Sequence, residues 1–354
     1  MDLSFWKGRR VLVTGHTGFK GAWLTLWLDR LGAEVSGLAL PAERDTEAFA
    51  ALGPWNTLDN AVVDIRDAEA VYATVKRQRP EVVLHLAAQA LVRRGYRDPV
   101  GTYETNVMGT VHLLRAVEST PSVKAVVVVT SDKVYANDGH PAAFREGDPL
   151  GHSDPYSNSK ACVELVTAAW RTSFLGAAGV ALATARAGNV IGGGDEAEDR
   201  LLPDVRRSLE AEAPLLLRNP EAVRPWQHVI EPVAGYLALA QSLVNDPSHV
   251  PPALNFGPSG SSCRPVRDVV ERVLAQWGSG SWAKAGGEQP AEAALLQLDS
   301  SLALRSLGWQ PRLDLDDALE WTVAWWRAQV GGNDMRAFSL AQLESYERRL
   351  GVSS

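Results

Sequence analysis

The feature that most constrains the fold is a glycine triplet that follows a short apolar run. Residues 10–14 read RVLVT and lead into Gly15, Gly18 and Gly21 with the spacing GxxGxxG. An apolar run of this length is typical of a buried parallel strand. The glycines let the backbone turn sharply and approach a pyrophosphate, which the free N–H groups of the next helix stabilise. We expect that helix over residues 22–31 and a dinucleotide at the turn; a tight turn that binds no ligand is the alternative.

Strands and helices alternate over most of the remaining chain. Apolar runs of strand length are followed by helical patterns, which is the arrangement of a parallel sheet covered by helices. We therefore expect an α/β fold: a Rossmann-type doubly wound parallel sheet with a smaller, mixed α/β C-terminal substrate-binding domain. The predicted strands are residues 34–40, 61–65, 81–86, 125–129, 180–185 and 254–256, and the later predicted helices are residues 156–173, 232–244, 266–277, 316–330 and 336–351.

The length of the chain predicts two closely packed domains, because 354 residues exceed a usual single core. The dinucleotide domain is expected over residues 1–186, with returning segments at about 225–258. The substrate domain is expected over residues 187–224 and 259–354. Twelve tryptophans could suggest a carbohydrate-stacking surface. Five of them fall at helical spacings that are more typical of a core, and these are Trp23, Trp27, Trp321, Trp325 and Trp326.

Charge and composition limit the kinds of partner. The formal charge of −7 gives no reason to expect a nucleic acid. The N-terminal sequence lacks the apolar core of a signal peptide, and no apolar run approaches the roughly 20 residues that span a bilayer. We therefore expect a cytoplasmic protein without a membrane partner. Cys162 and Cys263 stand without CxxC or His/Cys clustering, so neither a disulfide framework nor a metal site is expected.

The loop after the second predicted strand leaves the choice of dinucleotide open. An acidic residue at that strand end normally binds the adenosine ribose and selects NAD over NADP. Glu43 stands several residues after the position where that acidic residue is expected, and Arg44 beside it would suit the 2′-phosphate of NADP. Asp64 ends the third predicted strand, where it can reach the adenine or, equally, cap the next helix. Asn106 lies in a predicted helix, where asparagine is unfavourable, so it either hydrogen-bonds internally or is exposed.

Polar residues after the fifth predicted strand and at the start of the next helix form the candidate catalytic group. Ser131, Asp132 and Lys133 follow that strand and so reach the carboxyl edge of the sheet, where ligands bind in open α/β folds. Tyr156 and Lys160 are four residues apart, which puts both on one helix face. We expect the Lys160 ammonium to lower the pKa of Tyr156 and make it a base, while Ser131 binds the substrate oxygen. An ordinary YxxxK pair on a solvated helix is the alternative.

Later loops supply candidate substrate contacts. The loop over residues 137–155 is long enough to fold over a substrate. A glycine-rich loop at residues 192–194 follows another strand end, and its glycines could be punctuation only. Several arginines in an otherwise acidic chain suit a diphosphate, although scattered surface arginines are a serious alternative. A lone histidine is more often structural than a ligand. The candidate substrate contacts are Asn189, Arg200, Arg218, Arg224 and His228.

Seven motifs together carry a resemblance to a known family. They are GHTGFKG at 15–21, LAAQ at 86–89, TNVMGT at 105–110, TSDK at 130–133, DPYSNSK at 154–160, RAGNVIGGGD at 186–195 and RPWQHV at 224–229. On these motifs nearly the whole chain resembles the CDP-glucose 4,6-dehydratases, a branch of the extended short-chain dehydrogenase/reductases. GxxGxxG and YxxxK mark only the superfamily, whereas TSDK, GGGD and RPWQHV are close to this one branch.

The resemblance implies NAD as cofactor, CDP-glucose or a similar nucleotide-sugar as substrate, and a dehydration in deoxysugar biosynthesis. Tyr156, helped by Lys160 and Ser131, would take the hexose O4 proton as hydride leaves C4. The new ketone would acidify C5, water would leave across C5–C6, and hydride would return to C6. Asp132 would protonate the departing C6 hydroxyl. Lys133 stands where related dTDP-glucose dehydratases have Glu, and it would act either as a neutral base at C5 or as a cation that stabilises the enolate.

The resemblance also implies a homodimer, paired through the helices that hold Asn106 and Tyr156. It places the five candidate substrate contacts on the nucleotide-sugar side. The rival activities are a nucleotide-sugar 4-epimerase, which needs no acid beside Ser131, a dehydratase of another nucleotide-sugar, and a catalytically silent NAD-binding regulator. The residues expected to bind the cofactor are Gly15, Thr17, Gly18, Phe19, Lys20, Gly21, Asp64, Ile65, Leu86, Ala87, Ala88, Gln89, Asn106, Thr130, Tyr156 and Lys160.

Overall fold

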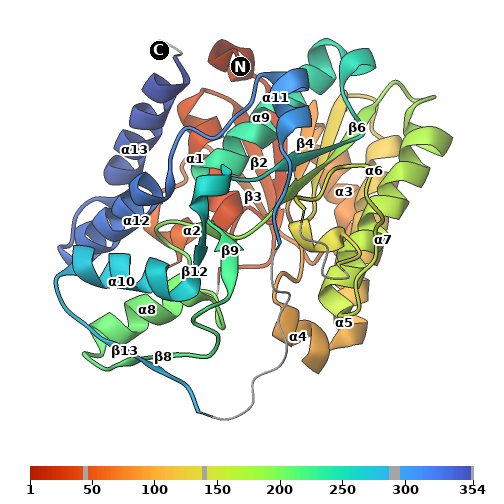
Figure 1. The fold of residues 1–354 in the computed structure, drawn as a ribbon. Helices are drawn as coiled ribbons and strands as arrows, with labels where there is room; N and C mark the ends of the chain where they lie inside the picture. Colours follow the sequence, from red (N-terminus) through yellow and green to blue (C-terminus); the bar gives the residue numbers. More distant parts are fainter. Residues whose placement is uncertain (43–46, 138–141, 287–295, 352–354) are drawn as a thin grey trace.

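A seven-stranded parallel sheet lies at the centre of the computed structural model, which describes residues 1–42, 47–137, 142–286 and 296–351 (Figure 1). The strand order is β11-β6-β5-β4-β1-β2-β3, and every neighbouring pair is parallel. This order confirms the predicted Rossmann-type sheet, in which the order reverses beside β1. The strands are β1 (Arg10–Thr14), β2 (Glu34–Ala39), β3 (Asp59–Val62), β4 (Val82–His85), β5 (Ala125–Val129), β6 (Ala181–Ala187) and β11 (Ala253–Phe256).

Helices cover both faces of this sheet, and successive strand residues alternate between the two cores. On β5, Val127 and Val129 join one buried cluster, whereas Val126 and Val128 join the other. This period-two pattern, with all five residues of the strand buried, is what a central parallel strand requires. Helices α1 (Phe19–Arg30) and α9 (Ile230–Asn245) contribute to the first cluster, and α3 (Ala68–Gln78), α6 (Gly109–Glu118) and α7 (Pro155–Trp170) contribute to the second.

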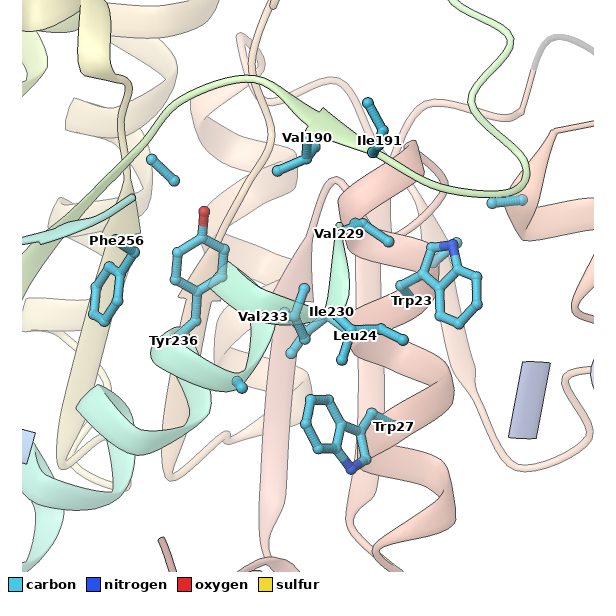
Figure 2. Packing of buried hydrophobic residues seen from close by; sticks show 14 of the residues in the cluster. Trp23, Leu24, Trp27, Val190, Ile191, Val229, Ile230, Val233, Tyr236 and Phe256 are labelled. Atoms are coloured by element: carbon cyan, nitrogen blue, oxygen red, sulfur yellow. The ribbon is translucent and has the colours of Figure 1, made fainter. Parts of the chain in front are cut away.

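The contact between α1 and α9 forms much of the first core (Figure 2). Trp23 and Trp27 on α1 are fully buried, and Ile230 and Val233 on α9 lie beside them. Trp27 also donates a hydrogen bond to Glu347 at 2.9 Å, which joins α1 to α13 (Met335–Leu350). The core prediction for these tryptophans is confirmed, and Trp325 and Trp326 on α12 (Leu315–Val330) are buried as well.

Short elements and two longer helices lie beyond the carboxyl edge of the sheet. The helices are α8 (Leu201–Glu210) and α10 (Val266–Trp277). Paired short strands accompany them, and a further short helix, α11 (Ser301–Leu307), packs beside β11. None of the helices in the described ranges combines the length and the apolar character needed to cross a membrane. The short strands are β7 (Val190–Ile191), β8 (Leu215–Leu217), β9 (Val223–Pro225), β10 (Gln227–His228), β12 (Cys263–Pro265) and β13 (Trp282–Lys284).

One sequence prediction about local structure was wrong, and one alternative is excluded. The third strand ends at Val62 rather than at residue 65, so Asp64 lies in the loop beyond it. The glycines at residues 192–194 are not mere punctuation, because a Cβ on Gly193 would overlap the ring of Trp325. The Gly193 carbonyl also accepts a hydrogen bond from Trp23 at 3.0 Å. Glycine at this position therefore lets the loop pack between α1 and α12.

Candidate active site

A cavity of about 950 Å³ opens where six strands of the sheet end. Residues that follow β1 to β6 line it, together with the start of α7 and the segment around α8. Ligand sites of open α/β sheets lie at this edge. All predicted site residues line the cavity except Asn106 and His228. The topology thus brings together residues that are up to about two hundred positions apart in the chain, such as Gly15 and Arg224.

The glycine turn after β1 is held tightly against the end of β4. Gly15 has φ of +71°, and a Cβ there would lie 2.7 Å from the backbone nitrogen of Ala87. The Thr14 hydroxyl accepts hydrogen bonds from the backbone N–H groups of Leu86 at 3.2 Å and Ala87 at 3.1 Å. Gly18 is the N-cap of helix α1 and provides no side-chain hydrogen bond to it. Its first N–H groups therefore face the cavity without a capping side chain, and this cradle fits a dinucleotide pyrophosphate.

A buried histidine supports this turn from within the sheet. His85 Nδ1 lies 2.7 Å from the Thr14 hydroxyl, and Nε2 lies 3.0 Å from the hydroxyl of Thr110 on α6. Burial lowers the pKa of His85 to about 3, so the ring is neutral at physiological pH. The sequence reasoning did not single out His85, because a histidine at the end of an apolar strand carries no distinct signal.

Asp64 and Arg66 form an ion pair at the expected adenosine end of the cavity. Arg66 donates to both carboxylate oxygens of Asp64, at 2.6 to 3.1 Å, and this contact lowers the pKa of Asp64. Asp64 does not cap the next helix, because Asp67 occupies that position and accepts from Ala70 N–H. The alternative of a helix cap was therefore wrong. Glu43 and Arg44, which bore on the choice between NAD and NADP, lie outside the described residues.

Asn106 lies behind the cavity wall, so the expectation of a direct cofactor contact is corrected. Its side chain is 1% exposed, which agrees with the first of the two alternatives, internal hydrogen bonding. The carboxamide accepts from the backbone N–H of Gln89 at 2.8 Å and donates to its carbonyl at 3.0 Å. It also donates to Ser159 Oγ on α7 at 2.8 Å. Asn106 therefore positions the Gln89 backbone, which does line the cavity.

Ser131, Asp132 and Lys133 meet at the end of β5. The Ser131 hydroxyl donates to Asp132 Oδ1 at 3.0 Å, and the Lys133 ammonium lies 3.3 Å from the same oxygen. Asp132 is 1% exposed. Within the described ranges its second oxygen, Oδ2, is buried without a hydrogen-bond partner. Burying a carboxylate oxygen without a hydrogen-bond partner costs free energy. A ligand hydroxyl that donates a hydrogen bond to Oδ2 would remove this cost.

Tyr156 stands opposite this group at the start of α7. Asp154 caps the N-terminus of that helix, because its carboxylate accepts a hydrogen bond from the backbone N–H of Ser157 at 2.9 Å. Burial raises the pKa of Tyr156, while Lys133 and a hydrogen bond with Ser131 oppose that rise. Lys160 instead donates to the Val129 carbonyl at 3.2 Å. Lys160 is not among the causes given for the pKa of Tyr156, so its predicted effect on the phenol stays a prediction.

Glu164, one turn after Lys160, ties α7 to the ends of β5 and β6 beneath the cavity. Its carboxylate accepts from Thr130 on β5's end, from Thr184 at 2.8 Å, and from two nitrogens of Arg186 at 2.8 and 3.0 Å. The ion pair of Glu164 and Arg186 is almost fully buried. Burial lowers the pKa of Lys160 to about 8, and Glu164 opposes that shift. This network was not predicted, because its members come from three separate segments.

Arginines at the far end of the cavity are paired with acidic residues. Arg200 lies 3.0 Å from Asp195, and this carboxylate raises the pKa of Arg200. The carboxylate of Asp199 lies 3.0 Å from the guanidinium of Arg218 and 2.9 Å from that of Arg93, so it links the two arginines. Arg224 lines the same cavity. The sequence analysis gave no role to Arg93, Asp195 and Asp199, since isolated charges give no indication of where they converge in the fold.

His228 is a buried structural residue, so the proposed substrate contact is corrected. It is 0% exposed and does not line the cavity. Its ring lies edge-on to Trp23 and Trp321, with centroids 5.9 and 5.7 Å away. Burial lowers its pKa to about 3. The RPWQHV segment instead contributes Arg224 and Trp226 to the cavity wall.

Among the described residues of the long loop before α7, those that line the cavity lie at its end. His152, Ser153 and Asp154 line the wall. Phe144 packs away from it, stacked on Tyr135 with ring centroids 4.9 Å apart. Residues 138–141 of the predicted cover lie outside the described residues.

Comparisons with known proteins agree with this geometry. The model of the NAD dependent epimerase/dehydratase family matches residues 11–255. CDP-glucose 4,6-dehydratase of Salmonella typhimurium is 46% identical over 352 residues, which cover 98% of each chain. A dTDP-glucose 4,6-dehydratase from Streptomyces venezuelae, solved with NAD bound, is 25% identical with a TM-score of 0.78 over 92% of this chain and 98% of that one. An epimerase from Methanothermobacter thermautotrophicus, 22% identical, has a TM-score of 0.82 over 93% of this chain and 95% of its own.

The parallel sheet, the glycine cradle and the serine–tyrosine–lysine group define a dinucleotide-dependent enzyme class. The chain belongs to the NAD dependent epimerase/dehydratase family. NAD is therefore the cofactor, which answers the question that residues 43 and 44 left open. The cradle formed by Gly15, Gly18 and Ala87 suits its pyrophosphate.

Proposed function

We propose that this chain is a CDP-glucose 4,6-dehydratase, which converts CDP-glucose into CDP-4-keto-6-deoxy-glucose and water. The observation that carries the proposal is the Asp132–Lys133 contact at 3.3 Å, placed beside Ser131 and Tyr156 in one cavity. Oxidation at C4 needs only a base and a hydroxyl partner, whereas elimination needs a further acid and a further base. The relative from Salmonella typhimurium, which bears this name, supports the choice of nucleotide-sugar.

The first step requires a base for the hexose O4 proton. NAD, held at the glycine cradle, would supply the redox chemistry at C4 and C6. Tyr156 takes the O4 proton, and Ser131 holds that oxygen through its hydroxyl. Lys133 and Arg200 oppose the burial that raises the pKa of Tyr156, so their positive charges favour the phenolate. Lys160 holds the strand end in place through the Val129 carbonyl.

The elimination follows from the acidity that the new C4 ketone gives to C5. Lys133 accepts the C5 proton, the electron pair forms the C5–C6 double bond, and the C6–O bond breaks. Asp132 protonates the departing oxygen, so water leaves; its Oδ2 is the oxygen placed for this transfer. Hydride return to C6 requires a proton at C5, which Lys133 gives back, so its amine is neutral again. The proton that Tyr156 received from O4 balances the one that Asp132 gave away.

The nucleotide diphosphate is assigned to the arginine end of the cavity. That end is lined by Arg200, Arg218 and Arg224. Asn189 also lines the cavity, and in the sequence it falls between the catalytic residues and these arginines. Guanidinium groups bind phosphate oxygens in a fixed fork geometry. The carboxylates of Asp195 and Asp199 hold two of these arginines in position before the substrate arrives.

The assembly and the location of the enzyme are part of the same proposal. A homodimer through α5 (Pro99–Tyr103), α6 and α7 is supported by exposed apolar side chains on neighbouring helices, namely Tyr96, Val100 and Leu165. Light scattering of a Leu165→Glu variant tests it, since a monomer is expected. The two-domain division and the cytoplasmic location remain predictions, for limited proteolysis and cell fractionation to examine.

Mass spectrometry of the nucleotide-sugar tests the proposed function. Purified protein is incubated with NAD and CDP-glucose, and loss of one water is expected. An unchanged mass with altered stereochemistry would instead indicate an epimerase, and no change with saturating NAD would contradict both activities. Tyr156→Phe should abolish turnover while cofactor binding persists. Tyr72→Phe, on α3 outside the cavity, is the matched control and should keep parental activity.

A further inference from the structure

Gly188 follows β6 directly and lies beside the acid of the proposed elimination. Strands β5 and β6 pair with Val129 opposite Ala185, and Asp132 and Gly188 each come three residues later. A hydrogen bond from the Thr130 N–H to the Ala185 carbonyl, at 2.9 Å, continues this pairing beyond β5. Both Asp132 and Gly188 line the cavity. The register of the sheet therefore brings Gly188 next to the carboxylate of Asp132.

The space that a side chain at position 188 would need is filled by this carboxylate. A Cβ added to Gly188 would lie 2.7 Å from Asp132 Oδ2 and 3.3 Å from its Cγ, so one of the two groups would have to move. The φ angle of Gly188 lies outside the left-handed region, so conformational freedom does not explain a glycine here. The room that Asp132 occupies does explain it.

Asp132 cannot move away from Gly188 and keep its other contacts. Its side chain is buried. Oδ1 accepts from the Ser131 hydroxyl at 3.0 Å and lies 3.3 Å from the Lys133 ammonium. Because both oxygens belong to one planar group, a displacement of Oδ2 also moves Oδ1 away from these partners. Among the described residues no hydrogen bond holds Oδ2, so its place is set by the contacts of Oδ1 and by the space at Gly188.

We propose that Gly188 is a positioning residue for Asp132: the missing side chain leaves the room in which Oδ2 reaches the oxygen that departs from C6 of the hexose. The inference rests on the proposed dehydration. In that step Oδ2 gives its proton to the C6 oxygen, and the C6–O bond breaks with its electron pair. The C5–H electron pair forms the C5–C6 double bond, and the C5 proton passes to Lys133. A side chain at position 188 would displace the acid, whereas oxidation at C4, which uses Tyr156, would continue.

The balance between oxidation and elimination tests this role. Gly188→Ala should lower kcat for water loss at least about tenfold, because a positioned acid contributes roughly 10²- to 10⁴-fold. Reduced cofactor should accumulate during turnover, visible in its near-ultraviolet absorbance, and KM should stay at its wild-type value. Gly147→Ala is the matched control, because Gly147 is exposed and no atom lies within 4 Å of an added Cβ. A parental rate of water loss in Gly188→Ala, or a slower rate without reduced cofactor, would overturn the proposal.

A double-mutant cycle that needs no turnover separates this inference from the proposed function. Gly188→Ala is made in the wild-type and the Asp132→Ala backgrounds, and urea denaturation compares the stability of the four proteins. Asp132→Ala removes the carboxylate and keeps its Cβ, which lies 3.7 Å from the added methyl group, an ordinary contact. Gly188→Ala should therefore lower the urea midpoint in the wild-type background and leave it unchanged in the Asp132→Ala background.

Equal lowering in both backgrounds would show that Gly188 serves another contact, and the proposal would be wrong. If Gly188→Ala alone does not fold, a folded double variant supports the contact with Asp132, and an unfolded double variant contradicts it. Coupling between the two positions, in a wild-type protein that releases no water from CDP-glucose, would support the contact and contradict the proposed function.

Discussion

Replacing Glu164 by Gln should weaken the fold and the chemistry together. Glu164 accepts from Thr130, Thr184 and Arg186, and the carboxylate and the guanidinium are 4% and 5% exposed. The neutral amide would leave the Arg186 guanidinium buried without a counter-charge. It would also present N–H groups to donors that now point at oxygen.

The expected magnitude follows from this burial. Removing one partner of a buried ion pair costs about 3–5 kcal/mol, because the remaining charge is uncompensated. The exposed pair of Arg115 and Glu118, at 3.0 Å on α6, is the matched control. Glu118→Gln should cost less than about 1 kcal/mol, since solvent screens that pair.

Urea denaturation of the two variants measures the free energy of unfolding by linear extrapolation. Glu164→Gln should also move the alkaline limb of kcat to lower pH, because Glu164 opposes the burial that lowers the pKa of Lys160 to about 8. A loss of stability no larger than that of Glu118→Gln would refute the reasoning. So would an alkaline limb that stays in place while the fold weakens.

Three further substitutions test the packing and the charges around the site. Gly193→Ala should lower the free energy of unfolding by about 1–3 kcal/mol, because the methyl group overlaps the Trp325 ring; an unchanged urea midpoint would contradict this packing. Glu231 is buried, and burial raises its pKa from 4.5 to about 7. Its contribution to stability is complete below pH 4.5 and falls by roughly 3 kcal/mol as the pH rises through 7, at about 1.4 kcal/mol for each pKa unit. The free energy of unfolding of Glu231→Gln, measured by urea titration, should therefore rise relative to that of wild type as the pH goes from acidic to alkaline. A difference between the two proteins that is constant with pH would argue against the raised pKa of Glu231. Asn106→Ala should weaken NAD binding about tenfold in calorimetry, the size expected for a lost buried anchor of Gln89, and an unaltered Kd would mean that other contacts hold Gln89.

The fold was predictable because its signals are local. The apolar run at residues 10–14 and the spacing of Gly15, Gly18 and Gly21 specify a strand, a turn and a helix without reference to the rest of the chain. The helix at Val266–Trp277 and the strand at Ala125–Val129 were predicted with the bounds that the structure has. The third strand was misplaced by a few residues, since β3 is a mostly exposed edge strand with little apolar pattern.

The site was predictable where residues follow strands and not where side chains converge from distant segments. Ser131 and Asp132 could be placed because the carboxyl ends of parallel strands share one edge. The direction of Lys160 could not, because helical spacing gives the face of a residue but not the contact that its long side chain makes. His228 lies next to cavity residues in sequence, yet the β10 backbone turns its ring into the core between Trp23 and Trp321.

The fate of a deuterium label at C4 tests the central claim most directly. Wild-type protein is incubated with NAD and CDP-glucose deuterated at C4, and the product is examined by mass spectrometry and NMR. The account predicts a product that has lost one water and carries the deuterium at C6. A product of unchanged mass with the label still at C4, or a dehydrated product whose C6 hydrogen comes only from solvent, would contradict it.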